Sequence, residues 1–308
     1  GLTVPTSHKV SAVFPRALTQ WSLPRGRILH RALRAHPVQE YLLYLPSTGV
    51  AGASVLVAVH GISRNAIEQA NAFAELCEKR GSVLVVPVFN AELHDDYQRL
   101  GRLGRGVRAD LALNRCLDEV AVLTGADVTQ FRLFGFSGEA QFAHRYLMVH
   151  PHRVSHAVIV AAGWYTHPDP GERYPYGIRN NRRMPNVNIN PEELLQVPIH
   201  VLVGAMDTGT NKLRRTQRVN AQQGETRLER AHSWVDAMRT AAVKYGMEPR
   251  VTLSDVDGVD HSFSAFSGRG RLQSRVDEIF FQDAGDIVPR AHAVTLDVPS
   301  DDSGHVER

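Results

Sequence analysis

The sequence is most informative at Phe131-Arg132-Leu133-Phe134-Gly135-Phe136-Ser137-Gly138-Glu139-Ala140, where an apolar run stops at a glycine-flanked serine and a helical pattern begins. A strand that turns sharply into a helix exposes the serine hydroxyl above the sheet and aims the helix N-terminus at a reacting carbonyl. Gly135 leaves room for such a turn, whereas Glu139 stands where the G-x-S-x-G pattern has its last glycine. The stretch predicts a nucleophile elbow at Ser137, with an ordinary strand-to-loop turn as the alternative.

Two further patterns follow in an order that suits the same chemistry. Residues 198–207 read as a short buried strand that ends in a glycine turn and Asp207. Residues 250–253 predict another strand, and the loop beyond it carries His261. A histidine takes the serine proton and an acid orients the histidine in nucleophilic catalysis. We therefore expect Ser137 as nucleophile, Asp207 as acid and His261 as base.

A fourth pattern lies upstream, where the apolar strand 54–59 runs into His60-Gly61-Ile62. A strand with the sequence Tyr41-Leu42-Leu43-Tyr44-Leu45-Pro46 precedes this His-Gly loop. In these two features and in the elbow, the chain resembles the α/β-hydrolases, nearest to their esterase and polyhydroxyalkanoate-depolymerase-like branch. The resemblance covers residues 39–281. It implies that backbone N–H groups of Ile62 and Gly138 form the oxyanion hole, and that His60 is structural.

The resemblance also bears on the choice of the acid among four aspartates. Asp260 adjoins His261, and consecutive residues in an extended loop point their side chains apart. Asp255 and Asp257 precede the same loop and stay as alternatives. Asp207 follows its own strand and glycine turn, which is where the acid sits in the fold that this chain resembles.

The hydrophobic pattern agrees with that architecture. Short apolar runs typical of strands buried on both faces alternate with stripes at helical spacing. The strands are expected at residues 54–59, 83–88, 131–136, 157–161, 198–203 and 250–253, and the helices at 67–77, 113–123, 142–147 and 228–245. Such alternation predicts an α/β-hydrolase fold with a mostly parallel sheet and helices on both faces.

Residues 1–284 are expected to form one domain, because no Pro/Gly/Ser-rich linker divides the pattern. Residues 164–191 break the alternation and are interpreted as a lid or pocket wall inserted after the sixth strand of the fold. Aromatic residues there, Trp164, Tyr165 and Tyr176, predict an apolar substrate wall, with anchoring of the loop to the core as the alternative. Residues 285–308 are polar and predict a mobile tail.

Charge, cysteine content and hydropathy limit the binding partners and the location that the sequence predicts. The net charge of +3 does not call for nucleic acid, and the basic clusters at 101–108, 179–183 and 214–218 are expected to be solvated, with an anionic substrate group as the alternative. Cys77 and Cys116 fall on apolar helix faces and predict buried thiols rather than a disulfide. No run approaches a membrane span and no signal pattern opens the chain, so a cytoplasmic location is expected; the first residue is Gly1, which leaves a trimmed leader open.

These patterns predict a serine hydrolase that cleaves a carboxylic ester through an acyl-enzyme, with no metal or organic cofactor. A peptidase, an amidase or an acyltransferase would use the same machinery. A binding protein that kept the fold and lost catalysis is the non-enzyme alternative, and Glu139 is the best argument for it. The sequence does not distinguish a small ester from a polymeric one, and it does not indicate an oligomeric state.

Overall fold

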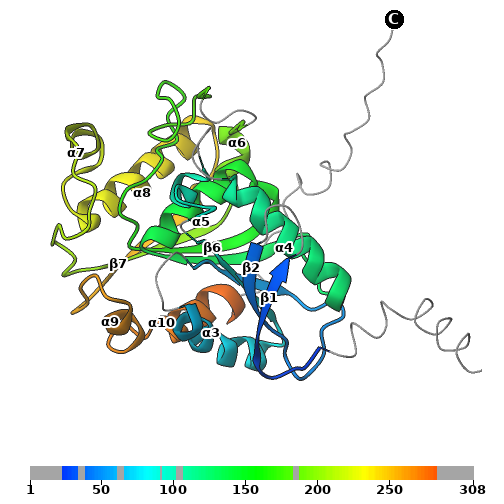
Figure 1. The fold of residues 1–308 in the computed structure, drawn as a ribbon. Helices are drawn as coiled ribbons and strands as arrows, with labels where there is room; N and C mark the ends of the chain where they lie inside the picture. Colours follow the sequence, from blue (N-terminus) through cyan, green and yellow to red (C-terminus); the bar gives the residue numbers. More distant parts are fainter. Residues whose placement is uncertain are drawn as a thin grey trace, which may run out of the picture.

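The computed structural model describes residues 23–33, 39–60, 66–90, 92–101, 107–182 and 187–282. One eight-stranded sheet runs through this part of the chain in the order β1-β2-β4-β3-β5-β6-β7-β8 (Figure 1). The strands are β1 (Ile28–Leu33), β2 (Gln39–Tyr44), β3 (Val55–Ala58), β4 (Val83–Val88), β5 (Phe131–Phe136), β6 (Val154–Val160), β7 (Ile199–Gly204) and β8 (Val251–Val256).

The sheet is mostly parallel, as predicted. β1 and β2 form an antiparallel edge, with β1 pairing to β2 and β2 to β4. The pairs from β4 through β3, β5, β6 and β7 to β8 are parallel. Because parallel strands end at the same edge of a sheet, the loops after β5, β7 and β8 gather on one side. These are the loops that carry Ser137, Asp207 and His261.

Helices cover both faces of the sheet, which confirms that prediction. They are α3 (Ala66–Arg80), α4 (Ala109–Thr124), α5 (Gly138–Val149), α6 (Pro191–Leu194), α7 (Gln217–Gln223), α8 (Arg227–Lys244), α9 (Phe263–Ser267) and α10 (Leu272–Asp277), with short turns η1 (Tyr97–Arg99), η2 (Pro151–Arg153) and η3 (Glu278–Gln282). Figure 1 shows α4, α5 and α8 on one face and α3 and α10 on the other. Two apolar cores result, one under each layer.

The predicted strands and helices all form, with ends that differ by a few residues. β1 is the strand that the hydrophobic pattern did not indicate. Its side chains alternate between half-buried and exposed, and it lies at the sheet edge, so its sequence lacks a buried strand's apolar run. Cys77 and Cys116 are buried free thiols as predicted, and burial raises the pKa of Cys116 to about 12.

The segment after β6 packs into the body of the protein. Its described residues, 161–182 and 187–190, hold no long helix or strand. The indole N–H of Trp234 in α8 donates to the Thr166 carbonyl at 2.7 Å, and the Tyr174 hydroxyl donates to the Arg99 carbonyl at 2.8 Å. These bonds anchor the segment to α8 and η1 as a fixed wall. The expected tail, residues 285–308, lies outside the described residues, and so do residues 183–186 of the segment.

Candidate active site

Ser137 occupies a sharp turn between β5 and α5. Its φ of 59° and ψ of −120° place a non-glycine residue at positive φ, a conformation that costs about 1–3 kcal/mol and that the surrounding structure must hold. The Ser137 N–H donates to the Val160 carbonyl at 2.8 Å. A Cβ on Gly135 would lie 2.6 Å from the Glu139 carbonyl oxygen, so the close approach of strand and helix requires glycine there. The turn forms although Glu139 replaces the last glycine of the pattern.

Three side chains from separate loops form a hydrogen-bonded chain at this turn. Nε2 of His261 lies 2.9 Å from Oγ of Ser137, and Nδ1 of His261 lies 3.0 Å from Oδ2 of Asp207. Asp207 is only 2% exposed. With Nδ1–H donating to this carboxylate, Nε2 is the acceptor that can take the serine proton. The structure thus brings together the three residues that the sequence placed in the roles of nucleophile, base and acid.

The other aspartates do not join this chain. Asp255 lies on the surface in β8, where its Oδ1 is 2.8 Å from Nε2 of His232. Asp257 and Asp260 are exposed, and neither bonds to His261. Of the four aspartates weighed from the sequence, Asp207 alone contacts the imidazole.

Aromatic and basic neighbours fix the His261 and Asp207 side chains. The Phe136 ring stacks on the imidazole with centroids 5.4 Å apart, and Phe263 packs edge-on against Phe136. Nη1 of Arg227, the first residue of α8, lies 3.9 Å from Oδ1 of Asp207. This buried guanidinium lies beside the carboxylate that accepts a hydrogen bond from the imidazole. No sequence motif marks Arg227 or Phe136, so sequence reasoning missed both.

Of the two predicted oxyanion donors, Gly138 and Ile62, the structure describes Gly138. Gly138 is the first residue of α5, and its N–H donates to no other described residue. Such a free N–H at a helix N-terminus beside the nucleophile suits a developing negative charge. Ile62 lies outside the described residues, so its role stays a prediction. His60 is fully buried and its backbone bonds to Pro87 and Phe89, in keeping with a structural role.

No model of a protein family and no curated protein matches the sequence. Among solved structures, poly(aspartic acid) hydrolase-1 from Sphingomonas sp. KT-1 is similar at TM-score 0.69 and 23% identity, over 82% of this chain and 98% of that chain. A poly(3-hydroxybutyrate) depolymerase from Bordetella parapertussis is similar at TM-score 0.68 and 23% identity, over 87% of this chain and 94% of that chain. The chain has the α/β-hydrolase fold.

A further α/β-hydrolase in this comparison is more distant. It is an S-formylglutathione hydrolase from Agrobacterium tumefaciens, with TM-score 0.56 and 12% identity over 82% of this chain and 94% of that chain. The matches therefore span nearly the full length of these relatives. The fold class predicted from the elbow and the strand pattern is confirmed.

A cavity of about 1290 Å³ opens above Ser137. Ser137, Gly138 and His261 lie on its wall, so the three-residue chain is accessible to a ligand. Much of the remaining wall is charged or carries side-chain amides, and includes Glu68, Gln69, Asp95, Asp96, Gln98, Arg99, Glu139, Gln141, Lys212, Arg214, Arg227 and Asp260. The site of this hydrolase fold is therefore wide and polar.

The three aromatic residues expected in the substrate wall lie in different places. Trp164 lines the cavity, between the guanidinium groups of Arg145 at 4.4 Å and Arg214 at 5.3 Å from its ring centroid. Tyr165 is fully buried and stacks on Trp234 with centroids 5.0 Å apart. Tyr176 packs on Trp164 and under Arg218 and is not among the residues that line the cavity. The expectation that Tyr165 and Tyr176 line the wall is wrong, because the Tyr165 ring packs on Trp234 and the Tyr176 ring packs on Trp164.

Tyr165→Ala is expected to destabilise the fold and not to change substrate preference. Removing a fully buried aromatic ring costs about 3–5 kcal/mol in the free energy of unfolding. Tyr176→Ala removes a half-buried ring and a cation–π contact and should cost about 1 kcal/mol. Urea unfolding of both variants checks the difference. A stable Tyr165→Ala protein with an altered KM would restore the wall interpretation.

The described arginines of the clusters at 179–183 and 214–218 lie mainly on the surface, as expected. Arg179, Arg182, Arg215 and Arg218 are exposed, and Arg218 pairs with Glu172 at 2.8 Å. Arg214 is the member that reaches the cavity. Residues 102–106 lie outside the described part of the chain. No helix among the described residues has the length and apolar character that crossing a membrane requires.

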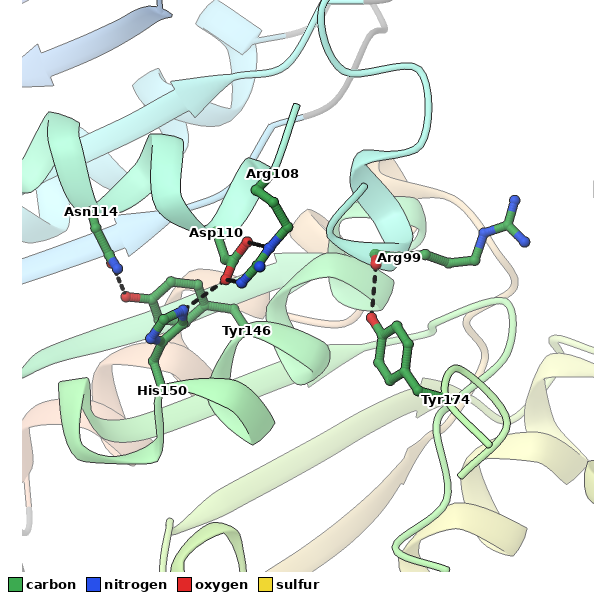
Figure 2. Close-up of polar contacts among 7 residues, drawn as sticks. All are labelled: Arg99, Arg108, Asp110, Asn114, Tyr146, His150 and Tyr174. Carbon is green, nitrogen blue, oxygen red and sulfur yellow. Dashed lines mark hydrogen bonds and ion pairs between the residues drawn. The ribbon is translucent and has the colours of Figure 1, made fainter. Parts of the chain in front are cut away.

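A second polar network joins α4 to α5 (Figure 2). Asp110 in α4 is fully buried and accepts from Nε of Arg108 at 2.8 Å and from Nε2 of His150 at 2.8 Å. Tyr146 bonds to Asn114 beside it. Burial by itself would raise the pKa of Asp110. The hydrogen bonds from His150 and Arg108 have the larger effect, and the pKa of this carboxyl lies below its usual value. The network joins the start of α4 to the end of α5, the helix that begins at the elbow.

Asp110→Asn is expected to lower the free energy of unfolding by about 2–3 kcal/mol near neutral pH, because charge-assisted hydrogen bonds are lost in a buried place. A lowered pKa in the folded state means that the ionised carboxylate contributes stability above its unfolded pKa of about 3.9. This contribution is lost as pH falls through the folded pKa. The gap in Tm between wild type and variant should therefore narrow below about pH 4.

The control for this prediction is Glu172→Gln, which removes the exposed ion pair with Arg218 and should cost under about 1 kcal/mol at every pH. Thermal melts of the wild type and both variants from pH 7 to pH 3 give the difference in Tm between the wild type and each variant. A gap for Asp110→Asn that is as small as the control's, or that widens in acid, would contradict the assigned role of the network.

Proposed function

We propose that the chain is a serine hydrolase that cleaves carboxylic esters through an acyl-enzyme intermediate. The observation that carries the proposal is the hydrogen-bonded chain from Ser137 through His261 to buried Asp207, at 2.9 Å and 3.0 Å, on the wall of an open cavity. Structural neighbours named as a depolymerase and an S-formylglutathione hydrolase support this reaction class.

The mechanism follows from the positions of the atoms. His261 Nε2 takes the Ser137 proton as the serine oxygen attacks the ester carbonyl, and Asp207 stabilises the imidazolium that forms. The Gly138 N–H donates to the oxyanion. His261 then protonates the leaving alcohol, and the acyl group stays on Ser137. A water molecule, deprotonated by His261, releases the acid by the same steps in reverse order.

The cavity wall bears on the substrate. An extended acyl chain would have to bury its methylenes against charged groups such as Arg99, Asp96 and Arg214. Taking such charged groups out of water against methylenes opposes binding. Short or polar acyl groups are therefore the substrates that the wall favours, and long-chain lipids are disfavoured.

Amide hydrolysis is the second candidate, and one comparison favours it. The neighbour named poly(aspartic acid) hydrolase-1 acts, by its name, on a polymer of an amino acid. The same nucleophile and base would serve an amide, provided that His261 can reach the leaving nitrogen. Parallel assays with p-nitrophenyl esters and p-nitroanilides of one acyl group separate the two.

The test is a pre-steady-state assay with p-nitrophenyl esters from acetate to dodecanoate. We expect a burst of p-nitrophenol that approaches one equivalent per protein wherever deacylation is slower than acylation, as an acyl-enzyme requires. Turnover should fall as the acyl chain lengthens. A folded protein that turns over none of these esters and gives no burst would contradict the proposal and favour a binding protein with this fold.

A further inference from the structure

Gln98 in η1 places its side-chain amide directly against the elbow. A Cβ built on Gly138 would lie 2.3 Å from Nε2 of Gln98, closer than any real side-chain contact. The end of the Gln98 side chain thus fills the space beside the residue that follows the nucleophile. Gln98, Ser137 and Gly138 line the same cavity.

The direction of this space decides what the amide can reach. In an α-helix each Cα–Cβ bond tilts toward the helix N-terminus. The space beside Gly138 therefore lies toward the N-terminal end of α5, where the free Gly138 N–H is found. Nε2 of Gln98 occupies that space, next to the donor already assigned to the oxyanion.

The backbone that carries Gln98 is held in place. Nη1 of Arg145 donates to the Gln98 carbonyl at 2.7 Å, and Nε of the same buried arginine donates to Thr166 at 2.8 Å. The next residue, Arg99, pairs with Asp96 at 2.8 Å and accepts from Tyr174 through its carbonyl at 2.8 Å (Figure 2). These bonds hold the backbone of Gln98 beside the elbow, so less reorganisation is needed to bring its amide to a developing charge.

The amide also has hydrogen-bonding capacity to spare. A glutamine NH₂ carries two donors. Among the described residues its one acceptor is the Tyr97 hydroxyl at 3.5 Å, the long limit of a hydrogen bond. At least one N–H is thus free for a ligand oxygen in the cavity.

We propose that Nε2 of Gln98 donates a hydrogen bond to the oxyanion, beside the Gly138 N–H. The inference rests on the proposed function. When the bond between Ser137 Oγ and the carbonyl carbon forms, the carbonyl π pair moves to oxygen and the serine proton goes to His261. Gln98 gives up no proton; it stabilises the charge on that oxygen, which is larger in the transition state than in the bound ester.

The test is Gln98→Met, which keeps the length of the side chain and removes the donor. Removal of one oxyanion donor lowers kcat by about 10²–10³-fold. KM should change by less than about threefold, and the Ki of a trifluoromethyl ketone analogue of the substrate should rise by the same factor as kcat/KM falls. The matched control is Gln130→Met, whose amide bonds to the His152 carbonyl outside the cavity and whose loss should leave kcat and Ki unchanged.

Gly138→Ala is the second variant, because its methyl group would push the Gln98 amide aside while leaving that amide in the protein. It should also lower kcat and weaken the ketone, even if Gln98→Met folds poorly. A wild-type burst together with a Gln98→Met protein whose kcat and Ki stay within about threefold would overturn the inference and leave the proposed function standing. A wild-type protein with no burst would overturn both.

Discussion

Ser137→Ala should reduce kcat for p-nitrophenyl acetate to near the rate in buffer, a loss of about 10⁶-fold. Without the Ser137 hydroxyl no acyl-enzyme can form, and only binding and the oxyanion donors are left to assist water. The burst should vanish with turnover. Alanine meets the same positive φ as serine, so the free energy of unfolding should change by less than about 1 kcal/mol.

The matched control is Ser254→Ala. Ser254 in β8 hydrogen-bonds to His200 at 3.0 Å and lies outside the cavity wall. Its loss should leave kcat within about twofold of wild type. A Ser137→Ala protein that keeps more than about a hundredth of wild-type turnover would show that another group is the nucleophile.

Asp207→Asn should lower kcat by about 10⁴-fold, as the equivalent change does in serine proteases. An amide at Oδ2 would no longer fix the tautomer in which Nε2 of His261 accepts the serine proton. It would also remove the negative charge beside the imidazolium. Asparagine has nearly the same shape, so the variant should fold, with some loss of stability because Arg227 loses its carboxylate partner and keeps only its bond to the Asn211 carbonyl.

The three other aspartates are the controls, because the sequence left them open as acids. Asp255→Asn removes a surface contact with His232, and Asp257→Asn and Asp260→Asn change exposed side chains. Each should cost far less than Asp207→Asn. The assignment of Asp207 fails if its variant keeps more than about a tenth of wild-type turnover while one of the other three drops by roughly 10³-fold or more.

The parts of the molecule that sequence predicted well depend on local rules. Apolar runs predict the buried strands. A serine between Gly135 and Gly138 at the end of such a run predicts the elbow. The loop positions of Asp207 and His261 follow from strand order, because parallel strands end at one edge. Their mutual distances then depend only on short loops, which is why the three residues could be named before the structure.

The errors and omissions have one physical cause, which is packing between distant segments. Whether Tyr165 faces the cavity or Trp234 is decided by α8, about 70 residues later in the chain. The contact of Gln98 with Gly138 likewise joins two loops that no periodicity connects. Arg227 approaches Asp207 only because α8 begins beside the loop after β7. Such contacts require the assembled fold.

Active-site labelling tests the central claim, a reactive serine at the elbow, most directly. Folded protein treated with a fluorophosphonate probe should gain one adduct, located by peptide mass spectrometry on the peptide that contains Ser137. Ser137→Ala should gain none, and prior incubation with a turned-over ester should slow labelling of the wild type. An adduct on another peptide, or no adduct in protein shown to be folded, would contradict the account.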